Sequence, residues 1–244
     1  MISELDTTTL LARAEYDHWW FQSRRAIMEQ LFWKTLSSSS SSKDIKILCV
    51  GCGTGSELEH AAQFGQVTGV DIDPQVIALC KEKGLNVIQA DILDASLPQE
   101  SFDVVVAMDV IEHIEDDYKT VQALSGLLKK GGHLLVTVPA LQCLWSSFDE
   151  EGDFPHFRRY TKKTLSMLLL SQPLKREKLS YYNFFLFPAA FLARKANSSF
   201  AAQMTVPSRW KNNLLRTIFS FEKYFLPWMS FPIGVSLVAI YKKQ

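Results

Sequence analysis

The stretch ILCVGCGTGSELEHAAQFGQVTGVDIDP, residues 47–74, decides the fold. It starts with a short apolar run and turns at Gly51, Gly53 and Gly55. Apolar residues at helical spacing follow, and a second apolar run ends at Asp71. A short apolar run that ends at glycine is typical of a buried strand, and glycines between a strand and a helix let the backbone turn tightly and approach a ligand closely. The stretch therefore predicts a strand, a ligand-binding loop, a helix and a second strand.

The same alternation continues along the chain. Short apolar runs predict strands at residues 46–50, 66–70, 85–89, 102–107, 133–138, 175–182 and 235–241. A helix with Val121, Leu124 and Leu128 as its apolar stripe is expected to end at Gly131–Gly132. Alternating strands and helices require parallel pairing with crossover connections. We therefore expect an α/β fold with a doubly wound, mostly parallel seven-stranded sheet.

Changes in composition divide the chain into four parts. Residues 1–42 read as a helical extension that ends in six consecutive serines, a tract typical of a linker because it has nothing to bury. Residues 43–182 hold the alternating core. Residues 183–234 form an aromatic, basic insertion that we expect to be helical, and residues 235–244 return to the sheet as its last strand.

The charges are separated along the chain. Residues 1–155 carry 11 Lys and Arg against 24 Asp and Glu, a net charge of −13, whereas residues 156–244 carry 15 against 2, a net charge of +13. Either the two parts attract each other within one fold, or the basic part meets an anionic partner. Four scattered cysteines and the lack of a secretory signal pattern at the start predict a reducing, cytoplasmic location.

Acidic residues end two of the predicted strands beside the glycine loop. Asp71 follows Gly51 by 20 residues, where a carboxylate can accept hydrogen bonds from both hydroxyls of a ribose. Asp91 ends the third strand, within reach of an adenine amino group. These positions predict an adenosine-containing cofactor. The spacing Gly-x-Gly-x-Gly differs from the Gly-x-Gly-x-x-Gly of dinucleotide sites, so an NAD(P)-dependent oxidoreductase is the alternative and not the first choice.

The motifs GCGTG, VTGVDIDP, QADILD and MDVIEHI, in this order, resemble the class I S-adenosylmethionine-dependent methyltransferases. The resemblance covers roughly residues 43–139 and implies a Rossmann-like methyltransferase sheet with S-adenosylmethionine as cofactor. It also implies the cofactor-binding residues: Gly51, Gly53 and Gly55 at the methionine portion, Asp71 on the ribose, Ile72 on the adenine, Asp91 and Ile92 at its edge, and Met108 and Asp109 opposite.

MDVIEHI is most similar to the subgroup that includes the ubiquinone-pathway O-methyltransferases. In that subgroup an arginine upstream of the glycine loop also contacts the cofactor. Arg24 and Arg25 both match that arginine, and the sequence does not align the pair uniquely. The patterns HWWFQSRR and FPHFRRYTKKTL also resemble bacterial methyltransferases from surface-glycan gene neighbourhoods, a similarity that implies no substrate.

His113, in MDVIEHI, is the candidate catalytic base. Methyl transfer from a sulfonium needs alignment of the nucleophile and exclusion of water, and an acceptor hydroxyl is helped by a neutral histidine. Asp109, Glu112 and His113 offer a second interpretation, a divalent-metal site. Three ligands within five residues seldom converge on one ion, so no metal is predicted.

His156, Arg159 and Tyr160 are the candidate residues for acceptor binding. Arginine suits a phosphate or carboxylate geometrically, and the alternative is a salt-bridged hinge that fastens the preceding acidic loop. We expect methyl transfer to an oxygen of a small acceptor that is lipid-linked or anionic. A non-catalytic protein that binds the cofactor and acts through its basic tail is the remaining alternative. The sequence has no recognised nucleic-acid-binding motif, so nucleic acid is not expected as a partner.

The insertion at residues 183–234 has three interpretations. Trp210, Leu214, Ile218, Phe221 and Phe225 share one helical face, and cationic residues lie off that face. This pattern fits a helix in a membrane interface, and it equally fits a lid over the substrate or a dimer face. Prolines and charges interrupt the apolar runs, so a transmembrane helix is not predicted, and the sequence leaves the oligomeric state open.

Overall fold

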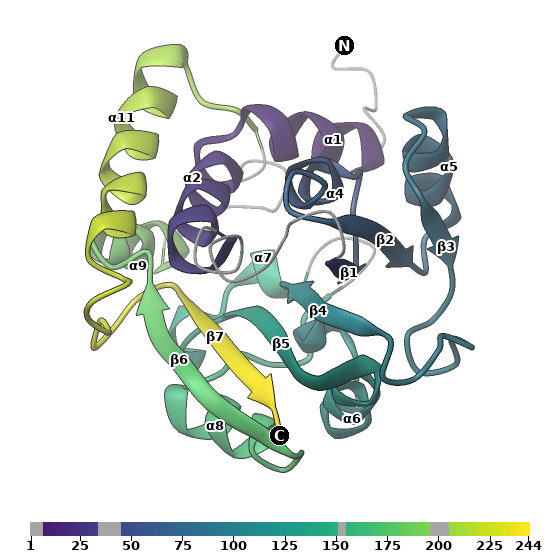
Figure 1. Ribbon diagram of the computed structural model, residues 1–244. Helices are drawn as coiled ribbons and strands as arrows, with labels where there is room; N and C mark the ends of the chain where they lie inside the picture. Colours follow the sequence, from purple (N-terminus) through teal and green to yellow (C-terminus); the bar gives the residue numbers. More distant parts are fainter. Residues whose placement is uncertain (1–6, 34–44, 151–154, 196–204) are drawn as a thin grey trace.

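The computed structural model describes residues 7–33, 45–150, 155–195 and 205–244, and the six-serine run lies outside them (Figure 1). One seven-stranded sheet with the order β3-β2-β1-β4-β5-β7-β6 forms the centre. Its strands are β1 (Lys46–Val50), β2 (Gln66–Asp71), β3 (Val87–Gln89), β4 (Phe102–Met108), β5 (Leu128–Pro139), β6 (Leu174–Tyr182) and β7 (Ser236–Lys243). β7 pairs antiparallel with both β5 and β6, and the other pairs are parallel. The predicted doubly wound, mostly parallel sheet is confirmed.

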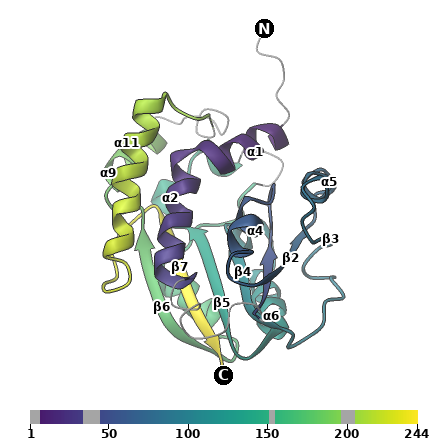
Figure 2. The same ribbon diagram turned by 45° about the horizontal axis from the view of Figure 1, so that its top comes forward.

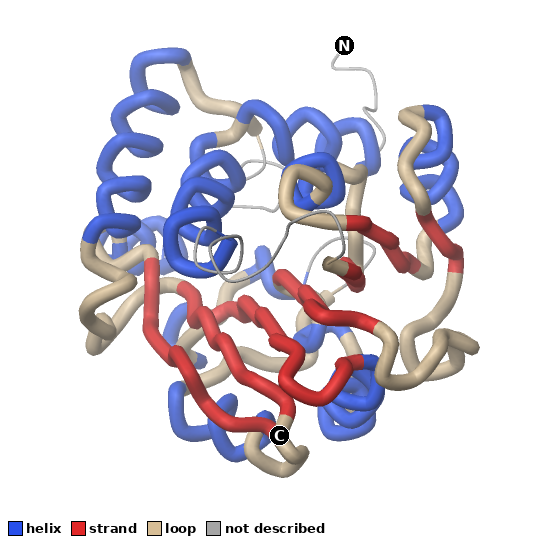
Figure 3. Tube along the Cα trace, viewed as in Figure 1, coloured by secondary structure: helices blue, strands red, loops and turns tan. Residues whose placement is uncertain are grey.

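Helices lie on both sides of the sheet (Figure 3). The core helices and turns are α4 (Ser56–Ala61), α5 (Pro74–Glu82), η3 (Ile111–His113), α6 (Asp117–Leu127), η4 (Gln142–Leu144), α7 (Ser147–Glu150) and α8 (Lys162–Leu169). Local signals set their starts. Asp73 caps α5 by accepting a hydrogen bond from the Gln75 backbone N–H, and Thr161 caps α8 through a reciprocal pair of bonds with Thr164. Because helices cover both faces, β1 and β4 read as continuous apolar runs.

The sixth predicted strand ends at Tyr182, as expected. The predicted end of the helix before β5 was wrong. The helix stops at Leu127, and Leu128 begins β5 by pairing with Phe102 on β4. Leu128 is fully buried in the core as a strand residue. Gly131 (φ +82°) lies within β5 instead of capping the helix, where its left-handed backbone permits an irregularity in the strand.

The N-terminal extension packs on the core. It forms α1 (Thr7–Asp17), α2 (Trp19–Met28) and a single π-helical stretch, η1 (Glu29–Trp33). Ile27 and Met28 are fully buried, and the Trp33 ring stacks on Phe64 with centroids 5.1 Å apart. The extension therefore belongs to the hydrophobic core.

The insertion between β6 and β7 forms α9 (Phe187–Lys195), α11 (Arg209–Ser220) and the turn η5 (Phe221–Tyr224). α11 runs along α2 on the outside of the molecule, and α2 lies between α11 and α4 (Figures 1 and 2). Asn212 joins the two helices: its Oδ1 accepts a hydrogen bond from the Trp19 backbone N–H at 2.9 Å, and its Nδ2 donates to the Asp17 carbonyl at 2.8 Å. The insertion thus packs against the outer side of the N-terminal helices.

Candidate active site

A cavity of about 890 Å³ lies where the carboxyl ends of the central strands meet α1 and α2. Ligands of doubly wound sheets bind at this edge, and the volume suits a cofactor with a small substrate. Most of the sequence-predicted site residues line it: Arg24, Gly51, Gly53, Asp71, Ile72, Asp91, Ile92, Met108, Asp109, His113, His156 and Arg159. Positions spread over more than 130 residues of sequence therefore share one cavity.

Two glycines form the floor of the cavity. Gly51 and Gly53 have φ angles of +62° and +54°, a left-handed conformation that side chains disfavour. A Cβ at Gly51 would collide with the Val110 side chain, and one at Gly53 would collide with the carboxylate of Glu15. Both positions therefore require glycine, and their bare backbone forms a cradle for a ligand.

Acidic and apolar side chains stand beside the cradle at the ends of β2 and β3. The Asp71 carboxylate accepts hydrogen bonds from the Gly53 and Asp73 backbone N–H groups, both at 3.1 Å. Burial raises the pKa of Asp71 above its ordinary value. Ile72 lines the cavity although 52% of its surface is exposed, and Ile92 is buried opposite. This combination of carboxylate and flat apolar walls suits a ribose and a purine.

Arg24 is the arginine that faces the cavity. Its Nη1 donates to Asp109 Oδ2, and its Nη2 donates to Glu57 Oε1 at 3.2 Å. Burial by itself would lower the pKa of Arg24, but the two carboxylates raise it above its ordinary value, so the guanidinium stays charged. Arg25 instead donates to Ser56 Oγ and does not line the cavity described here. Of the two arginines, Arg24 is therefore the one that lines the cavity.

Sequence reasoning missed Glu15 of α1. Its carboxylate is 6% exposed and accepts hydrogen bonds from the Thr54 backbone N–H at 3.0 Å and from Thr54 Oγ1 at 2.7 Å. α2 adds a wall of His18, Trp19, Trp20 and Phe21. No spacing signal in the sequence points to Glu15, because it lies 39 residues from Thr54.

These residues fit the cofactor that the resemblance implies. The glycine cradle, the Asp71 carboxylate and the apolar Ile72 suit an adenosine, and Glu15 lies where a cationic amino group would be stabilised. Among the described residues, the buried Nε of Arg24 has no hydrogen-bond partner, which leaves one donor for a carboxylate. S-Adenosylmethionine carries all of these groups.

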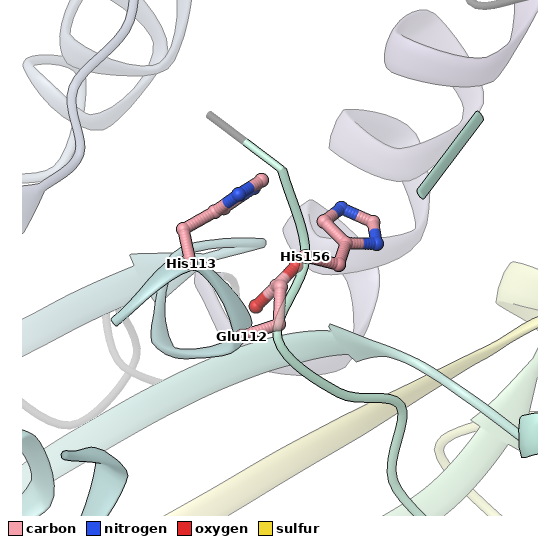
Figure 4. Close-up of side chains that lie close together, drawn as sticks. All are labelled: Glu112, His113 and His156. Carbon is pink, nitrogen blue, oxygen red and sulfur yellow. The ribbon is translucent and has the colours of Figure 1, made fainter. Parts of the chain in front are cut away.

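Glu112, His113 and His156 also line the cavity, and their side chains lie close together (Figure 4). One ligand atom from each lies within 4.8 Å of the others. Within the described part of the chain, neither oxygen of the fully buried Glu112 carboxylate has a hydrogen-bond partner. Burial, followed by the neighbouring Asp109, raises the pKa of Glu112 well above its ordinary value. The set is different from the metal ligands weighed from the sequence, because Asp109 pairs with Arg24.

A buried carboxylate, Asp149, organises the cations around these groups. It accepts hydrogen bonds from Arg159 Nε at 2.8 Å and Arg194 Nη1 at 3.2 Å, and it lies 2.7 Å from His156 Nδ1. These pairs outweigh the effect of burial and lower the pKa of Asp149. Burial, and then Arg159, lower the pKa of Arg194 to about 10. Neither Asp149 nor Arg194 was predicted from the sequence.

Two predicted residues lie away from the cavity. Tyr160 is 3% exposed, and its hydroxyl donates to Asp117 Oδ2 at 2.9 Å, so it packs behind the site rather than facing it. Gly55 precedes α4 in a left-handed conformation (φ +96°) and is not among the described residues that line the cavity. Tyr160 therefore anchors its segment to Asp117, and Gly55 forms the turn into α4.

Comparison with known proteins places the central part of the chain in a family. Residues 48–136 match the model of the methyltransferase domain. A ubiquinone biosynthesis O-methyltransferase of Xanthomonas oryzae is 35% identical over 100 residues, 38% of this chain and 42% of that protein. An uncharacterised methyltransferase of Mycobacterium bovis is 38% identical over 95 residues, 37% of this chain and 48% of that protein. The chain thus spans less than half the length of these curated relatives.

The likeness in fold extends beyond the matched domain. The structure of an S-adenosylmethionine-dependent methyltransferase from Archaeoglobus fulgidus superposes with a TM-score of 0.59 at 18% identity, over 98% of this chain and 100% of that one. Identity this low supports the fold alone. The domain match and the curated relatives favour a methyltransferase over the oxidoreductase alternative. Residues 48–136 form a domain similar to the S-adenosylmethionine-dependent methyltransferases, and the whole chain has the fold of such a structure.

Proposed function

We propose that this protein transfers a methyl group from S-adenosylmethionine to an oxygen of a small, anionic acceptor. One observation carries the proposal: a single cavity joins the glycine cradle and Asp71 to the cluster of Glu112, His113 and His156. When bound, the cofactor supplies an electrophilic methyl group on a sulfonium. The chain supplies binding, orientation, exclusion of water and a base.

The charges at the acceptor end favour an anion. Arg159 and Arg194 share one carboxylate, Asp149, which leaves an excess of positive charge. Burial raises the pKa of Glu112 well above its ordinary value, which disfavours a negative charge there. Arg159 Nη2 is buried and lies 2.8 Å from Asp149 Oδ1, so this guanidinium is held by Asp149. Arginine suits a phosphate or carboxylate geometrically, which supports an anionic acceptor beside this pair.

His113 is positioned to act as the base. Its Nδ1 lies 3.2 Å from the Pro155 carbonyl oxygen, which can only accept a hydrogen bond. Nδ1 therefore carries the proton of the neutral ring, and Nε2 is the basic nitrogen. The aromatic side chains of α2 line the cavity, and such apolar walls suit the exclusion of water. Both features suit removal of a proton from an acceptor hydroxyl during transfer.

The acceptor is identified by incubating a cell extract with the protein and an isotopically labelled methyl donor, followed by mass spectrometry. Asp71→Asn is expected to weaken cofactor binding by about tenfold to a hundredfold in calorimetry, because a charge-assisted hydrogen bond contributes roughly 1.5–3 kcal/mol. Asp94→Asn is the control, since Asp94 is exposed and does not line the cavity.

His113→Gln separates chemistry from binding. We expect turnover to fall by about a hundredfold, the range of general-base effects, with cofactor affinity unchanged. His133→Gln, on β5 and away from the cavity lining, is the matched control. Cofactor binding without turnover against any extract would instead support the non-catalytic alternative, and preferential binding of NADH would contradict the proposal outright.

A metal-assisted reaction is a second candidate, because the buried Glu112 carboxylate and two imidazoles form a donor set that divalent cations accept. In this version Glu112, His113 and His156 would hold the cation, which would supply Lewis acidity toward the acceptor oxygen, and His113 would be a ligand instead of a base. Cobalt(II) titration tests it: visible absorption bands that disappear in Glu112→Gln, together with turnover abolished by a chelator, support the metal version. Full turnover in chelator rejects it.

A further inference from the structure

An exposed aromatic surface covers the outside of the β6–β7 insertion. It comprises side chains that are 40–89% exposed: Phe185, Trp210, Leu214, Phe221, Tyr224, Trp228 and Met229. We call this set the aromatic face. Single exposed apolar side chains are common, but a group that includes two tryptophans marks an interaction surface. We infer that the aromatic face docks on the surface of a bilayer that contains anionic phospholipids.

The side chains of the aromatic face are not part of the hydrophobic core. On α11 the buried residues are Asn212 and Phe219, and Asn212 bonds to α2, as does Ser220 through Ser23 Oγ at 3.0 Å. The helix therefore turns Asn212 and Phe219 toward the protein and leaves Trp210 and Leu214 in solvent. A helix that only served the core would bury such apolar side chains.

Three side chains of the aromatic face contact one another, and two more share one face of α11. The Phe221 ring lies 6.1 Å from Phe185 and 5.9 Å from Tyr224, measured between centroids. Trp210 and Leu214 are four residues apart on α11 and therefore share one helical face. Trp228 follows η5 and is 89% exposed. Tryptophan and tyrosine concentrate at the level of lipid headgroups because their rings are apolar with one polar atom.

The charges around the aromatic face select an anionic surface. Residues 178–244 contain a single acidic residue, Glu222. It is fully buried, and its carboxylate accepts hydrogen bonds from the backbone N–H groups of residues 183–185. Cations flank the rings: Lys211 Nζ lies 5.6 Å from the Trp210 ring and Lys223 Nζ lies 5.1 Å from the Tyr224 ring. Each basic residue near an anionic leaflet adds to the attraction.

The insertion also reaches the active site. Ala190 and Ala193 of α9, with Thr205 and Pro207 just before α11, line the cavity. The segment that carries the aromatic face thus forms part of the acceptor's surroundings. Among the described residues, no helix is long and apolar enough to cross a bilayer, so the inferred contact is peripheral.

Co-flotation of the full chain with vesicles tests this inference. We expect binding to vesicles of phosphatidylcholine mixed with phosphatidylglycerol at low salt, and about tenfold weaker binding to phosphatidylcholine alone or at high salt. The double variant Trp210→Ala/Trp228→Ala and the charge variant Lys211→Glu/Lys223→Glu should each lose about tenfold in partitioning. Met167→Ala on α8, 65% exposed outside the aromatic face, should bind like the unmodified protein.

Cofactor titration of the same preparations shows that the variants remain folded, and it is independent of whether the proposed reaction occurs. Equal binding of all variants, or no binding to anionic vesicles, overturns the inference. A dimer in sedimentation velocity that dissociates in Trp210→Ala/Trp228→Ala, without vesicle binding, assigns the face to self-association instead. Binding only to an acidic protein would likewise overturn it.

Discussion

Neighbouring residues of one type have different roles in this protein, as Arg24 and Arg25 illustrate. They follow each other on α2, and helical geometry turns them about 100° apart. Arg24 points into the protein and bridges Glu57 and Asp109, whereas Arg25 lies near the edge of α4. The two residues therefore differ in burial and in the number of carboxylates they satisfy.

Arg24→Met should lower the free energy of unfolding by about 3–5 kcal/mol, because it leaves two carboxylates without their buried cation. Arg25→Met should cost at most about 1 kcal/mol, since its ion pair with Glu57, at 3.9 Å, is long. Urea denaturation of both variants measures the difference. Equal losses would show that the ion pairs of Arg24 with Glu57 and Asp109 add no more to stability than the single pair of Arg25.

A carboxyl group in the insertion gives stability a dependence on pH. Burial raises the pKa of Glu222 from 4.5 to about 7, although three backbone N–H groups act against the rise. The native chain then holds this proton more tightly than the unfolded chain does. Its contribution to stability is fully present below about pH 4.5 and is lost as the pH rises to about 7.

Glu222→Gln should remove this part of the pH dependence, which amounts to at most about 3 kcal/mol because one pKa unit corresponds to about 1.36 kcal/mol. Urea denaturation at intervals from about pH 4.5 to about pH 8 measures it. Glu82→Gln, on the exposed side of α5, is the control. An unchanged slope in Glu222→Gln would contradict the raised pKa.

At the scale of elements, most strands could be predicted and several packing partners could not. β1, β2 and β4 occur where apolar runs end at glycine or an acid, because a strand buried on both faces has a local signature. The end of α6 was misjudged because pairing between Leu128 and Phe102 overrides the helical spacing of Leu128. The apolar residues predicted on one face of α11 lie in different surroundings. Ile218 packs against the core, whereas Trp210 is exposed to solvent.

The contact between α11 and α2 depends on a polar residue. Asn212→Ala should lower the free energy of unfolding by about 1–3 kcal/mol, because the Trp19 backbone N–H and the Asp17 carbonyl both lose a partner. Asn213→Ala, exposed on the same helix, should change it by less than about 0.5 kcal/mol. Thermal unfolding of the pair measures this. Similar values for both would show that the helices associate through apolar contacts alone.

At the scale of the molecule, the cavity links parts that are distant in sequence. Its lining comes from α1, α2, the strand ends, α9 and the residues before α11. A ligand held there stabilises all of them together by mass action, with about 2.7 kcal/mol at a hundredfold excess over its dissociation constant. The N-terminal extension and the insertion are therefore expected to respond to the cofactor as one unit.

Hydrogen exchange should report this coupling. Saturating S-adenosylmethionine is expected to slow amide exchange in α2 and in the loop of Gly51 and Gly53, by up to about a hundredfold for amides that exchange through opening of the cavity. α8, which does not line the cavity, should change little. Asp71→Asn at the same cofactor concentration should lose the effect. Protection confined to the glycine loop would show that α2 does not close over the cofactor.

The sequence by itself determined the parallel sheet, the glycine cradle and the acids at the strand ends. Each depends on short-range features: an apolar run, a left-handed glycine, a carboxylate at the end of a strand. Only the tertiary structure decided which arginine faces the cavity, that Glu15 meets Thr54, and that Asp149 gathers Arg159 and Arg194. Trp19 and Asn212, in contact through a hydrogen bond, are 193 residues apart. Such contacts follow from how whole elements pack, and no local spacing encodes them.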